Sequence, residues 1–507
     1  MLAKVLSGTT IGLDGFLIEV EVDVADRGFP TFTIVGLPDK AVDEAKERVR
    51  TAIVNASLDM PDSRITVNLA PADIPKVGSS FDLPIAIGIL AAAGVIKKDV
   101  LETSLFVGEL SLEGKIRPVS GVLSIVLGAK QKNLTQVFIP QANAVEASMV
   151  EGVTIYPVKT LVDLIFHLNG QISLTPQPTL DLKNIETKER WEFDFSDIKG
   201  QITAKRALEI AAAGFHNLHL KGPPGAGKTM LSRAFPSILP PLTKEEILEV
   251  SKIYSVAGLL INSSFIFNRP FRSPHHTTSR IGLVGGGSQP QPGEISLAHR
   301  GVLFLDELPE FPRSTLEALR QPMEDGFISI SRAAGSLIFP CRFLLLAASN
   351  PCPCGFLGHP KKSCRCQPGA VLKYKRRLSG PLLDRIDLHI TVPPVEEEKL
   401  TANFSAESSA KIRERVIKAR ERQRIRFQET KITTNSEMTP SEIKKFCQLT
   451  PEALELLKQA ISQLSLSARS YFKTIKISQT IADLAGDEMI QACHIAEALQ
   501  FRGDDER

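Results

Sequence analysis

The segment Gly222-Pro223-Pro224-Gly225-Ala226-Gly227-Lys228-Thr229 (GPPGAGKT) decides the fold of the central part of this chain. It follows Asn217–Lys221 (NLHLK), which we expect to be a short strand, and it matches the pattern G-x-x-x-x-G-K-[ST] between a strand and a helix. The glycines let backbone N–H groups surround a phosphate at the positive end of the next helix. We predict that the loop binds a nucleotide, with Lys228 on the outer phosphates and Thr229 as a magnesium ligand.

A pair of carboxylates downstream fits the second half of such a site. The apolar run Gly301–Leu305 ends in Asp306 and Glu307. We predict that a buried strand delivers both groups, that Asp306 holds the magnesium through water, and that Glu307 polarises the attacking water. The alternative is a surface acidic pair that merely follows a core strand.

Two further strand ends supply candidate catalytic groups. An expected strand at Phe343–Ala348 leads to Asn350, which is predicted to orient the attacking water; a simple turn at the strand end is the alternative. Arg385 precedes the last expected strand, and an arginine there can reach the γ-phosphate held by a neighbouring subunit. The alternative for Arg385 is an ion pair with Asp384 or Asp387.

The length of 507 residues and the changes of pattern along the chain predict several domains. Gly15–Ala25 alternates between apolar and polar residues, as in a half-buried strand, and Asp39 is expected to cap a helix. Two Thr-Pro pairs near the end, at Thr439 and Thr450, are typical of helix starts. The expected units are a mixed α/β block over 1–168, a linker over 169–190, a doubly wound parallel sheet over 191–395, and a helical bundle over 396–507.

Composition restricts the partners and the location. Sixty Lys and Arg against 57 Asp and Glu give a net charge of +3, so any affinity for nucleic acid must come from local basic surface. The first residues lack the layout of a signal peptide, and the most apolar stretch, Leu83–Ile96, is too short to span a bilayer. We therefore expect a cytoplasmic protein without a membrane partner.

Four of the seven cysteines are clustered directly after Asn350 in the pattern C-x-C-x9-C-x-C. Four thiolates can close a tetrahedral zinc site with a structural role, whereas reduced thiols without metal are the alternative. His359 is a possible replacement for one ligand. The predicted zinc ligands are Cys352, Cys354, Cys364 and Cys366.

Together these residues resemble the AAA+ superfamily, in particular its magnesium-chelatase-like branch. Phe195–Gln201 resembles the segment that packs on adenine, Arg269–Gly301 the inserted element of this branch, and Gly326–Pro340 the hairpin before the sensor strand. Leu466–Tyr471 (LSARSY) resembles the lid motif, which implies that Arg469 senses the nucleotide; a structural role for this arginine is the alternative. The resemblance implies ATP and Mg²⁺ as ligands and a homo-oligomeric ring, expected to be a hexamer.

The N-terminal block resembles the proteolytic domain of Lon-type proteases, through PADIPKVGSSFDLPIA (71–86) and GELSLEGKIRPVSGV (108–122). Those enzymes use a Ser–Lys dyad. The serine position falls on Ser80, but the lysine position holds Leu123, which cannot take the proton of a serine. We therefore expect a Lon-like fold without peptidase activity.

The whole arrangement is similar to the ComM family, also described as YifB-like. This resemblance implies an ATP-dependent ring translocase or helicase that promotes branch migration of DNA in recombination and natural transformation; a chelatase-like motor that remodels a protein partner is the alternative. Candidate DNA contacts in the inserted elements are Arg272, Arg280 and Arg332, beside His275 and His276, for which metal binding is the alternative.

Two basic segments fit sequence-independent contacts to single-stranded or branched DNA. Lys361–Arg377 contains seven Lys or Arg and no acidic residue. Lys411–Phe427, in an expected helix over about 405–428, carries eight Lys or Arg against two Glu, and here a solvated helix face is the alternative. Aromatic residues make up only 6%, so platforms for base stacking are sparse.

Overall fold

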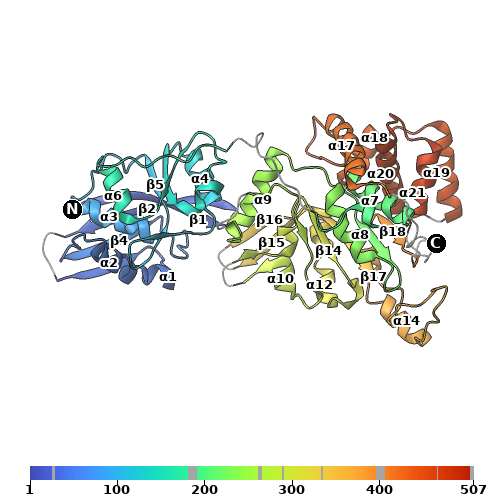
Figure 1. Cartoon of the computed structure of the whole chain (residues 1–507), viewed down its shortest axis with the longest axis horizontal. Coiled ribbons are helices and arrows are strands. Elements are labelled where there is room, and N and C mark those ends of the chain that lie inside the picture. Colours follow the sequence, from blue (N-terminus) through green and yellow to red (C-terminus); the bar gives the residue numbers. More distant parts are fainter. Residues whose placement is uncertain are drawn as a thin grey trace.

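The structure is a computed structural model. It describes residues 1–25, 29–180, 191–260, 265–287, 290–332, 335–394, 406–464 and 466–502. The N-terminal sheet with its helices lies at one end of the longest axis of the molecule, and the second sheet follows it; the C-terminal helices lie at the other end, beside the far part of the second sheet (Figure 1). Part of the expected linker, 181–190, and the expected boundary at 395/396 lie outside the described residues.

The N-terminal sheet has seven strands in the order β3-β4-β2-β1-β5-β8-β9. The pairs β1/β2 and β2/β4 are antiparallel and the remaining pairs are parallel. The strands are β1 (Leu2–Ile11), β2 (Asp14–Val24), β3 (Thr31–Val35), β4 (Arg64–Ala70), β5 (Ser104–Phe106), β8 (Gln136–Pro140) and β9 (Thr154–Val158), and a small hairpin adds β6 (Glu109–Leu110) and β7 (Ile116–Arg117). The predicted mixed α/β character of this block is confirmed.

Helices cover both faces of this sheet because alternate residues of a strand point to opposite sides. One core joins β1, β2 and β4 to α2, α3 and α6, and the other joins β5, β8 and β9 to α4 and α5. The side chain of Asp39 accepts a hydrogen bond from the Val42 backbone N at 2.8 Å, so the predicted helix cap is confirmed. The helices are α1 (Lys40–Asp43), α2 (Ala45–Asn55), α3 (Asp82–Ala92), α4 (Val122–Gln131), α5 (Ala144–Ala147) and α6 (Leu161–Leu168).

The second sheet has five strands, all parallel, in the order β11-β14-β17-β10-β18. All residues of β14 and β17 are buried, which explains why these strands read as continuous apolar runs in the sequence. The predicted parallel sheet is confirmed, with strand ends within one residue of the expected ones. The strands are β10 (Leu218–Lys221), β11 (Phe271–Arg272), β14 (Val302–Leu305), β17 (Leu344–Ser349) and β18 (Leu388–Thr391).

Helices pack on both faces of this sheet as well, in two separate cores. The helices around it are α7 (Ile202–Gly214), α8 (Lys228–Ala234), α9 (Lys244–Val256), α10 (Arg280–Val284), α11 (Glu294–Leu297), α12 (Arg313–Glu317), α13 (Arg320–Asp325), α14 (Pro368–Lys375) and α15 (Gly380–Leu383). Two antiparallel hairpins extend from it, β12 (Gly285–Gly286) with β13 (Gln291–Pro292), and β15 (Phe327–Arg332) with β16 (Gly335–Pro340).

The C-terminal part is helical, as predicted. Thr439 forms a capping box with Glu442, and the next helix begins at Pro451. Buried residues of α17 and α20 share one core with α7, so these two helices pack against a helix that covers the second sheet. The helices are α17 (Ser409–Arg426), α18 (Pro440–Phe446), α19 (Pro451–Leu464), α20 (Ala468–Ala485) and α21 (Ala492–Gln500).

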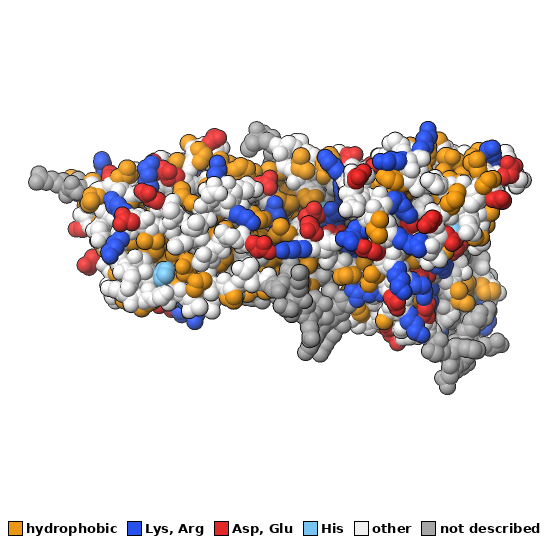
Figure 2. All heavy atoms as spheres, turned by 90° about the horizontal axis from the view of Figure 1, so that it is seen from above, with side chains coloured by type: hydrophobic (Ala, Val, Ile, Leu, Met, Phe, Trp, Pro, Cys, Tyr) orange, Lys and Arg blue, Asp and Glu red, His pale blue; other side chains and the backbone are white. Residues whose placement is uncertain are grey.

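Acidic and basic side chains are interspersed on the face of the molecule in Figure 2, with Lys and Arg most frequent over the second sheet and the C-terminal helices. Among the described residues, no helix combines the length and the apolar character that crossing a bilayer requires.

Candidate nucleotide site

Three neighbouring strands end at the same edge of the second sheet. Lys221 pairs with Ser349 at the ends of β10 and β17, and Leu305 of β14 lies beside Ala347. Because the strands are parallel, their carboxyl ends meet, and the segments that follow them form a crevice there. The register therefore brings the phosphate loop, the acidic pair and Asn350 together.

The phosphate loop has the backbone that its glycines predict. Gly225 and Gly227 adopt left-handed conformations, with φ of 78° and 86°, and α8 begins at Lys228. The buried Lys228 Nζ donates to the backbone oxygens of Gly222 and Pro223, at 2.7 and 2.9 Å, and to Asn350 Oδ1 at 3.1 Å. Burial lowers the pKa of Lys228, and the nearby Asp306 and Glu307 oppose that shift. Asn350 thus touches the lysine of the loop.

The acidic pair also reaches the loop. Thr229 Oγ1 donates to Asp306 Oδ2 at 2.9 Å, so a hydroxyl and a carboxylate oxygen, both hard ligands, lie together where magnesium was predicted. Glu307 adopts a left-handed backbone conformation, with φ of 51°, and its side chain is half exposed. His276 Nδ1 lies 3.9 Å from Glu307 Oε2. This contact between His276 and Glu307 was not predicted from the sequence.

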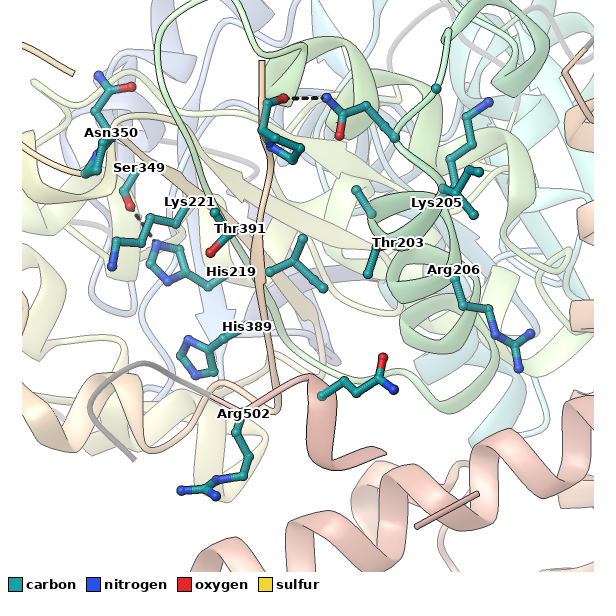
Figure 3. A pocket seen from close by; sticks show the side chains of 18 of the residues that line it. Thr203, Lys205, Arg206, His219, Lys221, Ser349, Asn350, His389, Thr391 and Arg502 are labelled. Carbon is teal, nitrogen blue, oxygen red and sulfur yellow. Dashed lines mark hydrogen bonds between the residues drawn. The ribbon is translucent and has the colours of Figure 1, made fainter. Parts of the chain in front are cut away.

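A cavity of about 1260 Å³ opens beside Asn350. In Figure 3, Ser349 and Asn350 lie at one end of it, and Lys205 and Arg206 of α7 at the other. Gln201, in the segment compared with an adenine-packing element, donates to the backbone oxygens of Ala226 and Pro393, at 3.2 and 2.7 Å. The cavity has room for a nucleotide, and it lies beside the phosphate loop: residues 222–229, Asp306 and Glu307 are not among the residues that line it.

Arg385 and Arg469 lie together, apart from Lys228. Both guanidinium groups bind Glu324 Oε1, each at 2.6 Å, and both line a second cavity of about 590 Å³. Among the described residues, Arg385 forms its ion pair with Glu324 and not with Asp384 or Asp387, the expected alternatives. Glu324 was not singled out in the sequence because it lies 145 residues from Arg469.

The four cysteines predicted to bind zinc are brought together. Their sulfur atoms all lie within 4.8 Å of one another, so the cluster has the geometry to bind a metal ion. Backbone hydrogen bonds, first from Phe356 and then from Arg365, lower the pKa of Cys354 to about 6. The His359 ring instead accepts hydrogen bonds from the backbone N–H groups of Lys361 and Lys362.

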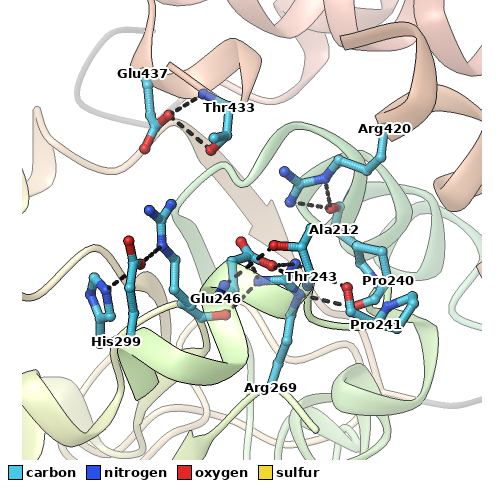
Figure 4. A network of polar contacts seen from close by, with 12 residues as sticks. Ala212, Pro240, Pro241, Thr243, Glu246, Arg269, His299, Arg420, Thr433 and Glu437 are labelled. Carbon is cyan, nitrogen blue, oxygen red and sulfur yellow. Dashed lines mark hydrogen bonds and ion pairs between the residues drawn. The ribbon is translucent and has the colours of Figure 1, made fainter. Parts of the chain in front are cut away.

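The inserted element is anchored by internal ion pairs. Arg269 donates to Pro240 O and Arg300 O and binds Glu246 at 2.8 Å, while Arg300 and His299 bind the Glu249 carboxylate (Figure 4). These contacts hold the start and the end of the insertion to α9.

The predicted DNA residues differ in their surroundings. Arg272 makes a two-pronged ion pair with Glu294, at 2.6 and 2.7 Å, whereas Arg280 at the start of α10 is exposed. The backbone of Arg332 lies at the end of β15, and its side chain is outside the described part of the structure.

The two basic segments also differ. All seven cations of Lys361–Arg377 are exposed. At least six of the eight cations of α17 bind groups of the same chain, which favours a structural role for that helix. Burial lowers the pKa of Arg420, which donates to Ala212 O, to about 9.

In the N-terminal block, Leu123 is buried in α4, where the sequence comparison placed the missing lysine. Two polar residues next to Ser80 in the sequence bind groups other than Ser80: Ser79 donates to Glu109, and the buried Asp82 binds Arg48 at 2.7 Å.

Comparisons with known proteins agree with this architecture. Family models described as "Magnesium chelatase, subunit ChlI", "Subunit ChlI of Mg-chelatase" and "Magnesium chelatase, subunit ChlI C-terminal" match residues 194–400, 20–143 and 406–502. The five-stranded parallel sheet, the phosphate loop and these matches define a magnesium-chelatase-like protein of the AAA+ class.

Individual relatives narrow the family. The chain is 46% identical to "Competence protein ComM" of Haemophilus influenzae over 504 residues, which is 99% of this chain and 97% of that protein. It is 42% identical to "Uncharacterized protein YifB" of Escherichia coli over 99% of this chain and 97% of that protein. The chain therefore belongs to the ComM/YifB family. It is also 29% identical to "Lon protease 2" of Bacillus subtilis over 167 residues, 30% of each chain.

Proposed function

We propose that this chain is an ATPase that moves DNA through a ring of identical subunits, a hexamer, without reading the DNA sequence. One observation carries the ATPase part: Lys228, Thr229, Asp306 and Asn350 are joined by direct contacts at one edge of a parallel sheet, with Glu307 next to them.

Each residue has a role in the proposed hydrolysis. The loop Gly222–Thr229 cradles the phosphates, and Lys228 turns from its loop carbonyls to the outer phosphates of ATP. Thr229 and Asp306 hold Mg²⁺, which neutralises charge that develops on the phosphates. Glu307 takes the proton of the attacking water, and Asn350 orients that water.

The ring explains the positions of two arginines. Arg385 and Arg469 line a cavity other than the one that opens at Asn350, and both are fixed by Glu324. In the proposed ring, Arg385 stabilises the transition state in the neighbouring subunit, and Arg469 senses the nucleotide.

DNA is proposed as the track because exposed cations lie on elements that extend from the ATPase sheet. These are Arg280 of α10 and the seven cations of Lys361–Arg377. Arg332, whose backbone lies at the end of β15, is proposed as a further DNA contact, and Arg272 is held by its ion pair with Glu294 of α11. The full-length likeness to a competence protein favours branch migration in recombination and natural transformation. The proposed location is the cytoplasm.

The proposed domains are a Lon-like domain without peptidase activity (1–168), a linker (169–190), the ATPase domain (191–395) and a helical lid (396–507). The loss of the general base at Leu123 and the partial likeness to a Lon protease support the first. Zn²⁺ bound by the four cysteines is proposed as a structural cofactor.

A second candidate function is a motor that remodels a protein partner, as in metal chelation. The descriptions of all three family models favour it, and the second of them matches the N-terminal block too. The near-complete coverage of ComM favours the DNA motor instead.

The test is steady-state ATPase activity with and without single-stranded, duplex and branched DNA. Glu307→Gln is expected to lower hydrolysis by about a hundredfold or more while nucleotide still binds. DNA is expected to stimulate the unmodified protein several-fold. Hydrolysis that ignores every form of DNA would remove the track and favour the protein-remodelling candidate.

A matched pair of variants tests the DNA surface. Arg280→Ala is expected to weaken the stimulation by DNA without changing hydrolysis in its absence. Arg424→Ala is the control, because Arg424 is an exposed arginine on α17 that already binds Glu421 at 2.7 Å. Equal effects of the two substitutions would show that α10 has no special part in DNA binding.

A further inference from the structure

The cysteine cluster has the dimensions of a tetrahedral thiolate site. The sulfur of Cys352 lies 3.4 Å from that of Cys354 and 3.7 Å from that of Cys364, and the Cys354 and Cys364 sulfurs are 3.6 Å apart. Four sulfurs around Zn²⁺, with bonds of about 2.3 Å, lie about 3.8 Å from one another. The chain therefore holds the ligands close to the separations that zinc requires.

Backbone groups also point at the sulfurs. The N–H of Leu357 donates to Cys352 Sγ at 3.3 Å, and those of Cys354 and Cys366 donate to Cys366 Sγ and Cys364 Sγ, both at 3.4 Å. Such donors orient metal-bound thiolates and stabilise their charge. The loop is thus folded around its cysteines.

This loop lies directly against the phosphate loop. Gly355, between the second and third cysteines, has φ of +80°, and a Cβ added to it would come within 2.4 Å of Pro224 Cδ. At the start of the same segment, Asn350 accepts from Lys228, and Ser349 O accepts from the Gly222 backbone N at 3.1 Å. The cysteine loop therefore touches the nucleotide loop at Pro224 and continues from the residue that contacts its lysine.

We propose that Zn²⁺ bound by Cys352, Cys354, Cys364 and Cys366 clamps this segment against the phosphate loop, so that the metal fixes Pro224 and Asn350 in the conformation that binds ATP. The metal takes no part in the chemistry, because four protein ligands leave it no open position. The inference rests on the ATP-binding part of the proposed function and is independent of DNA. Metal occupancy then sets the affinity for nucleotide.

Two glycines of this loop provide a test of the contact. Gly355 and Gly358 both have positive φ, at +80° and +77°, so alanine strains the backbone at either position. Among the residues that the structure describes, none lies within 4 Å of a Cβ at Gly358, whereas a Cβ at Gly355 meets Pro224. Gly358→Ala therefore tests the effect of backbone strain alone. Gly355→Ala introduces the same kind of strain and, in addition, pushes the new side chain against Pro224 of the phosphate loop.

The experiment uses the full chain with Glu307→Gln, which prevents hydrolysis, and measures bound zinc by elemental analysis and the Kd for fluorescently labelled ATP. Both glycine variants are expected to keep one zinc per chain. Gly355→Ala is expected to weaken ATP binding about tenfold, and Gly358→Ala by less than about twofold. Equal ATP affinities in the two variants, with zinc retained, would overturn the clamp.

Removal of the metal gives the second arm. Cys364→Ser, checked for folding by circular dichroism, is expected to lose zinc and to bind ATP about tenfold more weakly. Unchanged ATP affinity in a zinc-free, folded variant would overturn the proposal. If zinc is present but the unmodified phosphate loop binds no ATP, the ATPase assignment fails instead, and the two failures are therefore distinguishable.

Discussion

At the scale of single residues, the surroundings of Glu307 are informative. Its carboxylate lies at the end of β14, and His276 approaches it from the segment that follows β11, the neighbouring strand. The His276 ring lies against the His275 ring at a tilt of 36°, with ring centroids 4.0 Å apart, and forms a T-shaped contact with the buried Phe311. The imidazole is therefore held in place by aromatic neighbours, and we expect it to position Glu307 rather than to bind a metal.

Replacement of His276 tests this role. His276→Ala is expected to lower kcat about tenfold, because a catalytic group that is displaced by a fraction of its working distance loses much of its effect. The KM for ATP is expected to change by less than about twofold, since the described contacts of His276 are to Glu307, His275 and Phe311 and not to the phosphate loop. His276→Asn, which keeps a polar group near the carboxylate, should recover part of the lost rate. A rise in KM with unchanged kcat would contradict a positioning role.

At the scale of elements, α9 connects the N-terminal sheet to the ATPase sheet. Thr243 and Glu246 cap its start, and Glu246 also holds Arg269 of the insertion (Figure 4). At its other end, Ser255 donates to the buried carboxyl of Glu146, at 2.6 Å, and accepts from the backbone N of Leu123. The helix thus links α4 and α5 of the N-terminal block to the inserted element.

The contribution of the Ser255–Glu146 hydrogen bond to stability can be measured by comparing two serine substitutions on α9. Burial raises the pKa of Glu146. Ionisation of this carboxyl group therefore lowers the stability of the folded protein as the pH rises. The hydrogen bond from the Ser255 hydroxyl stabilises the ionised form and offsets part of that loss. Ser255→Ala is expected to cost about 1–3 kcal/mol at neutral pH, because it leaves a buried carboxylate short of a donor. The measurement is thermal unfolding together with hydrogen exchange of α4 and α9.

Ser251→Ala serves as the control for that comparison. Ser251 is fully buried one turn earlier on α9, and its hydroxyl has no hydrogen-bond partner among the described residues. Its replacement is expected to change stability by less than about 0.5 kcal/mol or to raise it slightly. Equal losses from the two substitutions would argue that Ser255 acts by packing alone.

At the scale of the whole molecule, the separation of the catalytic groups predicts an assembly. Lys228, Asp306 and Glu307 lie at one site, and Arg385 with Arg469 lines another cavity. If hydrolysis requires Arg385, a neighbouring copy must bring it to the first site. Under the proposed function, assembly into a ring is therefore a condition for activity.

A mixing experiment tests that condition. Arg385→Ala and Glu307→Gln are each expected to be inactive alone, the former because loss of such an arginine costs about a thousandfold or more. In an equal mixture, an interface between two subunits is active when the Arg385→Ala subunit supplies the nucleotide site, with its intact Glu307, and the neighbouring Glu307→Gln subunit supplies Arg385. Random assembly then restores about a quarter of the activity. No recovery in rings shown to be mixed by mass measurement would place Arg385 outside the neighbour's site.

Much of the fold and of the nucleotide site could be predicted from local sequence. The phosphate loop, the carboxylates after β14 and the helix cap at Asp39 are encoded within a few residues, because strand, turn and cap depend on short-range sterics and hydrogen bonds. The parallel sheet was predicted from the alternation of strands and helices over 191–395, and the cysteine spacing already indicated one cluster.

Only the tertiary structure decided which distant side chains meet. Glu324 joins Arg385 to Arg469, Gly355 lies against Pro224, and His276 lies beside Glu307, although none of these pairs is adjacent in the sequence. It also decided that most cations of α17 bind partners in the same chain rather than forming an open basic face. The physical reason is that a motif depends on the backbone conformation of one short segment, whereas contacts between distant segments depend on how all the layers of the molecule pack together.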